Sequence, residues 1–242
     1  MALTCVTAPC SSPTATATSR KSANRRAPRL FNALGKKNTT RTSQTGLFNA
    51  TEKLMAASPI LVQFGMASFA QVHRLLGFCD GMPMASVWRT SESLSEFVQR
   101  LLPWCVVKAD DQYFNLRFPD TRRLLDIVGV LSDEQRAQFF GPASLCLLPL
   151  REGGWSCLPV PVSAEPPTDK VELDQAQTRA LIRAGEADET LYQLHFHSHI
   201  APAVLADCYP VAKRALQQAD REGVDAPAER YMRCMAALGA AV

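Results

Sequence analysis

The stretch NLRFPDTRRLLDIVGVLSDEQRAQFFGP, residues 115–142, contains several helix signals in direct succession. Asp120 precedes a helical pattern of apolar residues, where a carboxylate accepts hydrogen bonds from the first free N–H groups of a helix. Ser132 and Gln135 have the spacing of a capping box, which predicts a second helix directly afterwards. Gly141 suits a left-handed helix end, and the proline after it prevents continuation. The stretch therefore predicts a strand end followed by two consecutive helices.

Strand and helix patterns alternate on both sides of this stretch. Short apolar runs predict strands at 59–64 and 84–89, and a serine-capped apolar stripe predicts a helix at 93–103. Residues 104–118 and 144–160 have the pattern of two strands joined by a tight turn, with Asp-Asp in the first turn and Gly-Gly in the second. These patterns predict a mixed sheet with packed helices.

The composition divides the chain into four segments. They are a disordered basic tail (1–57), an α/β lobe (58–160), a Pro-rich linker (161–170) and an all-helical lobe (171–242). In the last segment Asp174 is expected to cap the first helix and Gly185 to end it. The predicted fold class is α/β, of the α+β kind, with a mixed-sheet lobe followed by a small helical lobe.

The tail differs from the rest of the chain in charge. Residues 1–57 contain nine basic residues and one acidic residue, whereas the remainder contains 17 basic and 22 acidic residues. Three interpretations stay open: an arm that binds nucleic acid or membrane, an organellar transit peptide, or a misassigned start with translation beginning near Met55. Because aromatic residues do not alternate with the basic ones, a single-strand binding platform is disfavoured and no nucleic-acid partner is expected.

Cysteine usage and hydropathy indicate the compartment. None of the eight cysteines forms a CxxC pair, and most lie in apolar surroundings, which is typical of reduced, buried thiols in a cytoplasmic protein. No apolar run reaches about 18 residues, so no transmembrane helix and no membrane partner are expected.

Arg117, Asp120, Arg122 and Arg123 form the densest polar cluster in the sequence. Such a cluster at a helix N-terminus can bind phosphate or carboxylate, and in an enzyme Asp120 could act as a general base. Alternatively, Asp120 caps its helix while it pairs with Arg117. The structural interpretation is favoured, because the cluster has a single acid and no His, Cys or Ser partner nearby in sequence.

His195, His197 and His199 are a second candidate. On a helix, His195 and His199 would share a face and could hold zinc. The flanking residues predict a helix, but no HExxH glutamate accompanies them and no cysteine lies at ligand spacing. We therefore expect no metal and no cofactor, and keep a small hydrolase or metal enzyme using Asp120 or these histidines as the rival hypothesis.

Several segments, in this order, resemble the effector-chaperone or adaptor family of bacterial type VI secretion, known as DUF4123. They are SPILVQF, SVWRTSESLSEFVQRLLPW, FNLRFPDTRRLLDIVGVLSDEQRAQFFGP, LREGGW and REGVDAPAERYMRCMAALG. The resemblance covers about three quarters of the chain. The family usually has another strand and helix ahead of SPILVQF, which residues 1–57 do not provide, so an exposed sheet edge is expected.

The resemblance implies a cytoplasmic, non-enzymatic adaptor that binds a toxic effector protein and helps load it onto the secretion spike protein. Apolar and arginine side chains are expected to anchor the partner. The residues expected to form the binding surface or to hold its turn are Arg89, Arg117, Asp120, Arg122 and Arg123. A nucleic-acid binder acting through the basic tail is a further alternative.

Overall fold

The computed structural model describes residues 2–6, 60–64, 85–151, 153–197 and 205–239, with five further residues between 73 and 79. The chain forms two compact units, Met1–Gln177 and Thr178–Val242. Among the described residues, no helix has the length and apolar character needed to cross a membrane.

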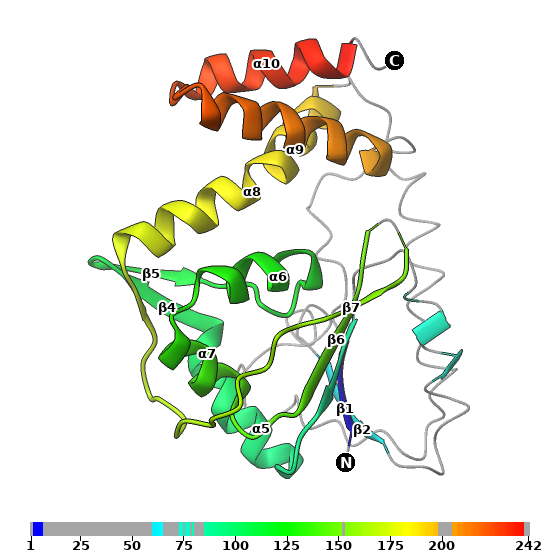
Figure 1. The fold of residues 1–242 in the computed structure, drawn as a ribbon, viewed down its shortest axis with the longest axis vertical. Coiled ribbons are helices and arrows are strands. Elements are labelled where there is room, and N and C mark those ends of the chain that lie inside the picture. The colour runs from blue at the N-terminus through cyan, green and yellow to red at the C-terminus, as the bar shows by residue number, and fades with distance from the viewer. Residues whose placement is uncertain are drawn as a thin grey trace. The chain divides into compact units, whose positions relative to one another are not determined.

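A five-stranded sheet in the first unit includes a strand from the start of the chain (Figure 1). In sheet order, its strands are β2 (Ile60–Phe64), β1 (Ala2–Val6), β3 (Ala85–Arg89), β6 (Leu145–Pro149) and β7 (Trp155–Cys157). β1 pairs antiparallel with both β2 and β3. This differs from the expectation of a tail without a strand, because β1 supplies a strand ahead of SPILVQF. The rest of residues 1–57 lies outside the described part of the chain.

The β1 strand has only a weak local signal. Its sequence ALTCV is a five-residue run beside a long polar segment, so composition alone does not separate it from the tail. Its backbone groups find their partners in β2 and β3, which follow more than fifty residues later in the chain. Long-range pairing of this kind is decided by the tertiary structure.

Both hairpins predicted from the sequence form. β4 (Val106–Ala109) and β5 (Gln112–Asn115) pair antiparallel around the Asp-Asp turn, and β8 (Glu172–Leu173) joins β4 in parallel, so that β5 and β8 are the edges of a second sheet. β6 and β7 form the other hairpin, and Gly153 and Gly154 adopt positive φ in its turn. Residues 161–170 contain no helix or strand and lie within the first compact unit.

Three helices of the first unit begin at the predicted caps. They are α5 (Leu94–Leu101), α6 (Thr121–Val130) and α7 (Asp133–Phe140), with a 3-10 turn (Leu102–Cys105) after α5. Ser93 and Glu96 make both reciprocal bonds of a capping box on α5, and Ser132 and Gln135 do so on α7. These bonds satisfy N–H groups that have no partner inside the helix. The predicted α+β class is therefore confirmed.

An aromatic cluster around Phe139 forms the centre of this unit. The rings of Trp88, Trp104, Phe118 and Phe140 have their centroids 5.1–5.6 Å from that of Phe139, mostly edge to face. These residues come from β3, the 3-10 turn, the segment before α6, and α7. The cluster therefore packs β3, the 3-10 turn and the segment before α6 against α7, in the edge-to-face geometry that favours aromatic pairs.

Arg100 lies beside this cluster with only 2% of its surface exposed. Its guanidinium makes a two-point ion pair with Glu92, donates to the carbonyl of Phe139, and lies 5.0 Å from the centroid of Phe97. The carbonyl belongs to the last turn of α7, where no intrahelical donor is available. A Cβ at Gly141 would lie 2.5 Å from Nε of this arginine, and the φ of Gly141 is +51°.

We expect Gly141→Ala to destabilise the first unit by about 1–3 kcal/mol, because the methyl group would displace Arg100 and the backbone would be strained. Gly129→Ala, in the open space on α6, is the matched control and should be neutral or stabilise by up to about 1 kcal/mol. Urea unfolding followed by tryptophan fluorescence reports on this unit, because it contains all three tryptophans. Equal midpoints for both variants would contradict the close packing of Gly141 on Arg100.

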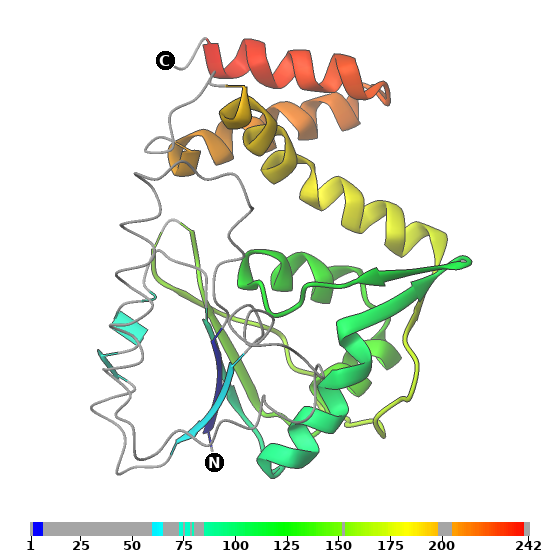
Figure 2. The same cartoon turned by 180° about the vertical axis from the view of Figure 1, so that it is seen from behind.

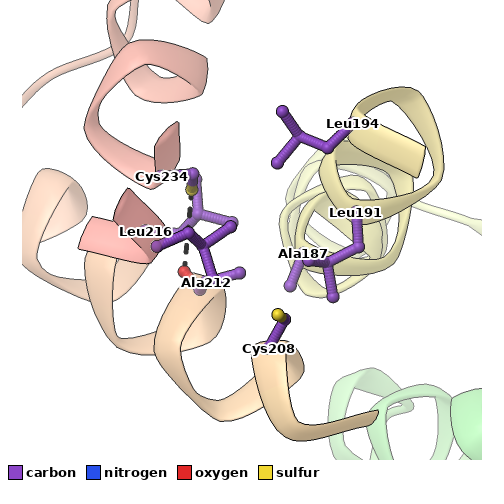
Figure 3. Packing of buried hydrophobic residues seen from close by; sticks show 8 residues of the cluster. Ala187, Leu191, Leu194, Cys208, Ala212, Leu216 and Cys234 are labelled. Carbon is purple, nitrogen blue, oxygen red and sulfur yellow. Dashed lines mark hydrogen bonds between the residues drawn. The ribbon is translucent and has the colours of Figure 1, made fainter. Parts of the chain in front are cut away.

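The second unit contains most of α8 (Gln175–Phe196), together with α9 (Leu205–Arg221) and α10 (Pro227–Gly239). Figure 3 shows the apolar side chains that these three helices direct toward one another. Leu191 and Leu194 come from α8, Ala212 and Leu216 from α9, and Cys234 from α10. The described residues from Gln175 onward are mainly helical, as predicted, but the predicted all-helical lobe (171–242) also includes strand β8 (Glu172–Leu173), which pairs with β4 of the first unit.

The start of α8 agrees with the sequence prediction, but its length does not. The Asp174 carboxylate accepts from the Gln177 N–H at 2.7 Å, so the predicted cap forms. The prediction that Gly185 ends the helix is wrong, because α8 continues through this residue to Phe196. A glycine inside a helix costs only about 1 kcal/mol, and packing of the later turns through Leu191 and Leu194 outweighs that cost.

Arg230 on α10 links all three helices of this unit while only 1% exposed. Both Nε and Nη2 donate to the Glu186 carboxylate of α8 at 2.6 Å, and Nη1 donates to Asp220 of α9 and to the Val224 carbonyl at 2.8 Å. The hydrogen bonds that Arg230 donates to Glu186 raise its pKa further above its already high value. The arginine is therefore buried with its charge fully compensated.

We expect Arg230→Ala to destabilise the helical unit by about 3 kcal/mol or more, because Glu186 and Asp220 lose their buried partner. Arg233→Ala on the same helix removes ion pairs to Glu222 and Glu229 that lie at the surface, and should have a much smaller effect. Urea unfolding followed by circular dichroism at 222 nm compares the two. If both variants lose a similar amount of stability, the buried ion pairs of Arg230 contribute no more than the surface ion pairs of Arg233.

Candidate functional site

The turn between β5 and α6 brings Arg117, Asp120 and Arg122 together. The Asp120 Oδ1 atom accepts from the backbone N–H of Arg122 at 3.2 Å and from its Nε at 2.8 Å. Oδ2 accepts from Nη2 of Arg122 at 2.6 Å and from Nη2 of Arg117 at 3.1 Å. One carboxylate therefore caps α6 and holds two arginines, which confirms the predicted cap and its pairing with Arg117. We call these three residues the arginine–aspartate corner.

The backbone fixes this corner to the core. Arg117 has a φ of +55°, and its N–H donates to the Asn115 side chain at 3.1 Å. The Asp120 N–H donates to the Arg117 carbonyl at 2.9 Å and closes the turn. Leu116 and Phe118 on either side are buried, so the chain is anchored at two points while Arg117 points outward with 55% of its side chain exposed.

The charges of the corner favour a carboxylate that is ionised at neutral pH. Partial burial acts to raise the pKa of Asp120, but the hydrogen bonds and positive charges of Arg122 and Arg117 outweigh it and hold the pKa below the ordinary value of 3.8. Such a carboxylate is a weak base at neutral pH. Two arginines share it, so the corner carries a net positive charge.

The other two predicted residues have partners of their own. Arg123 pairs with Asp126, one turn further along α6, at 3.5 Å. Arg89, at the end of β3, donates from Nε to the Ser144 hydroxyl at 2.8 Å, and the Ser144 N–H donates to the Arg89 carbonyl at 2.7 Å. These contacts hold β3 to the segment before β6. The arginine–aspartate corner therefore contains three of the five predicted residues.

The predicted histidine cluster is only partly described. His195 lies in the last turn of α8 and His197 in the turn after it, whereas His199 lies outside the described residues. No group of three His, Cys, Asp or Glu side chains suited to hold a metal occurs in the described part of the chain. Among the cysteines, burial raises the pKa of Cys79 and Cys234 to about 11, so neither is a thiolate at neutral pH.

Exposed apolar side chains on the β4–β5 hairpin were not predicted as candidate binding residues. Tyr113 is 72% exposed, Phe114 44% and Val106 49%. Large exposed apolar side chains grouped on one element are typical of interaction surfaces. The only signal in the sequence is the adjacent pair Tyr113 and Phe114, which an apolar strand pattern explains equally well as core.

The family model described as "Domain of unknown function (DUF4123)" matches residues 22–138. The matched segment contains the arginine–aspartate corner and begins within the predicted tail. It confirms the family resemblance predicted from the sequence, and the family is associated with type VI secretion. Neither the curated proteins nor the solved structures include a significant match to the chain.

We expect Asp120→Ala to lower the stability of the first unit by about 1 kcal/mol or more at pH 7, through loss of the helix cap. Asp120→Asn keeps a good capping group but removes the charge. Its free energy of unfolding should therefore lie between those of the alanine variant and the wild type. The folded-state pKa is lowered, so the electrostatic contribution is present at neutral pH and is lost as the pH falls below 3.8.

Urea unfolding of the three proteins between pH 7 and pH 3 measures both effects. The difference in free energy of unfolding between the wild type and Asp120→Asn should become smaller toward pH 3. If this difference in free energy of unfolding does not change with pH, the charge of Asp120 does not contribute to stability. If the urea midpoint of Asp120→Ala equals that of the wild type, the side chain does not stabilise α6 as a cap.

Proposed function

We propose that this protein is a non-catalytic adaptor that binds a type VI secretion effector in the cytoplasm and helps load it onto the spike protein. The observation that carries the proposal is the family match over residues 22–138, because the family is associated with this secretion system. The matched segment includes the exposed hairpin and the arginine–aspartate corner next to it.

The chemistry of the corner supports a binding role. A general base needs a free lone pair and a pKa raised toward neutrality. Both oxygens of Asp120 instead accept from arginine side chains, and its pKa is lowered. Arginine and tyrosine, exposed here at Arg117 and Tyr113, are the residues most often found at the energetic centre of protein interfaces.

Deletion of the gene from its host provides the test. We expect one effector to disappear from the secreted fraction, measured by quantitative mass spectrometry, while the spike and tube proteins remain secreted. Expression of the wild-type protein from a plasmid should restore that effector. Secretion of every effector at wild-type levels in the deletion strain would overturn the proposal.

The same strains can test the rival hydrolase. Asp120→Asn keeps an acceptor oxygen for the cap but weakens the hold on Arg117 and Arg122, so a binding role predicts at least partial restoration of secretion whenever this variant accumulates to wild-type levels. A catalytic role predicts a folded but inactive protein. Restoration of secretion by Asp120→Asn would therefore rule out a mechanism that depends on the carboxylate as base.

A further inference from the structure

Among the described residues, strand β5 pairs only with β4 and forms one edge of the three-stranded sheet, and its hydrogen-bond register shows which of its backbone groups face away from β4. The Leu116 N–H donates to the Cys105 carbonyl at 3.2 Å, directly beyond the last strand pair. In an antiparallel pair, hydrogen-bonded and non-bonded positions alternate. Tyr113 and Asn115 are therefore the β5 residues whose N–H and C=O groups point away from β4.

This edge lacks the features by which proteins usually protect an exposed strand. All four residues of β5, QYFN, are exposed, and none is a lysine or a proline. Tyr113 lies opposite Lys108 and diagonal to Val106, so an aromatic and an aliphatic side chain share the outer face. The edge strands β7 and β8 are shorter, with three and two residues, and the edge strand β2 includes the buried side chain of Leu61. Figures 1 and 2 show the hairpin projecting beyond α5 and α7.

The two ends of β5 carry opposite charges. Asp110 and Asp111, in the turn before the strand, are exposed and make no ion pair with any described residue. Arg117, two residues after the end of the strand, shares its carboxylate partner with a second arginine, and its side chain is 55% exposed. An added strand therefore meets negative charge at one end and positive charge at the other.

We propose that β5 binds an extended segment of the effector as an additional strand. Backbone hydrogen bonds to Tyr113 and Asn115 would supply affinity, and alternate apolar side chains of the segment would pack on Tyr113 and Val106. In an antiparallel arrangement the segment has an acidic residue facing Arg117, an apolar run, and a basic residue facing Asp110 and Asp111. This inference rests on the proposed function, which makes the effector the partner.

Substitutions at position 113 separate backbone pairing from side-chain contact. Tyr113→Pro removes the outward N–H without removing a bond to β4, and Tyr113→Lys introduces the charge that protects natural edge strands. Tyr113→Thr removes the ring but keeps the N–H and a β-forming side chain, so it is the matched control. We expect the proline and lysine variants to lose at least about tenfold in affinity for the purified effector relative to the threonine variant.

The charge arrangement has its own variant. Asp111→Lys should weaken effector binding about tenfold at low ionic strength, and less in 0.5 M salt, because the contact is exposed and screened. Asp111→Asn is the control and should have a smaller effect. Calorimetric titration of the full-length chain with the effector identified by the secretion experiment measures all five variants, and thermal unfolding shows which of them are folded.

The outcomes distinguish this inference from the proposed function. If the effector depends on this protein for secretion but binds all folded variants equally, strand addition is wrong and the adaptor role stands. If no effector depends on the protein, both are overturned. If Tyr113→Pro fails to fold, the affinity of Tyr113→Lys relative to Tyr113→Thr tests strand addition instead. A concentration-dependent dimer that Tyr113→Lys abolishes without affecting effector binding would assign the edge to a second copy of this chain and overturn the proposal.

Discussion

The buried guanidinium of Arg100 is the interaction on which the packing of the first unit depends. It joins Glu92, in the segment after β3, to the last carbonyls of α7, and it contacts the aromatic cluster at Phe97. A charge in this position is tolerable because each of its three nitrogen atoms donates to an acceptor, two of them to the Glu92 carboxylate. The position of Arg100 also explains why residue 141 is a glycine, because a residue with a side chain would leave no room for the arginine.

The helical unit also contains a buried arginine that is paired with a glutamate. Arg230, like Arg100, is buried, is held at two points by a glutamate, and donates to a backbone carbonyl near the end of a helix. In both units the arginine connects segments that are distant in sequence, with hydrogen bonds whose directions a purely apolar contact would not specify. Replacing either pair by apolar residues could preserve stability, but the geometry of the helix ends would then be less well defined.

The arginine–aspartate corner is built differently, because its arginines remain largely exposed. Leu116 and Phe118 anchor the turn in the core, and the Asp120 carboxylate orients Arg117 and Arg122. A surface whose side chains are already held in place loses less entropy when a partner binds. The adjacent hairpin adds exposed aromatic side chains and an open strand edge, so charge, apolar area and backbone donors occur together on consecutive elements of the chain.

The sequence alone determined the features whose partners lie within a few residues: the caps at Ser93, Asp120 and Ser132, the two hairpins, and the pairing of Arg117 with Asp120. The two partners of each of these hydrogen bonds are close in sequence, so the local sequence specifies them. Only the tertiary structure decided that Ala2–Val6 joins the sheet, that α8 continues through Gly185, that Arg100 and Arg230 are buried, and that β5 is left as an open edge. Each of these depends on which distant segments meet, and neither composition nor periodicity contains that information.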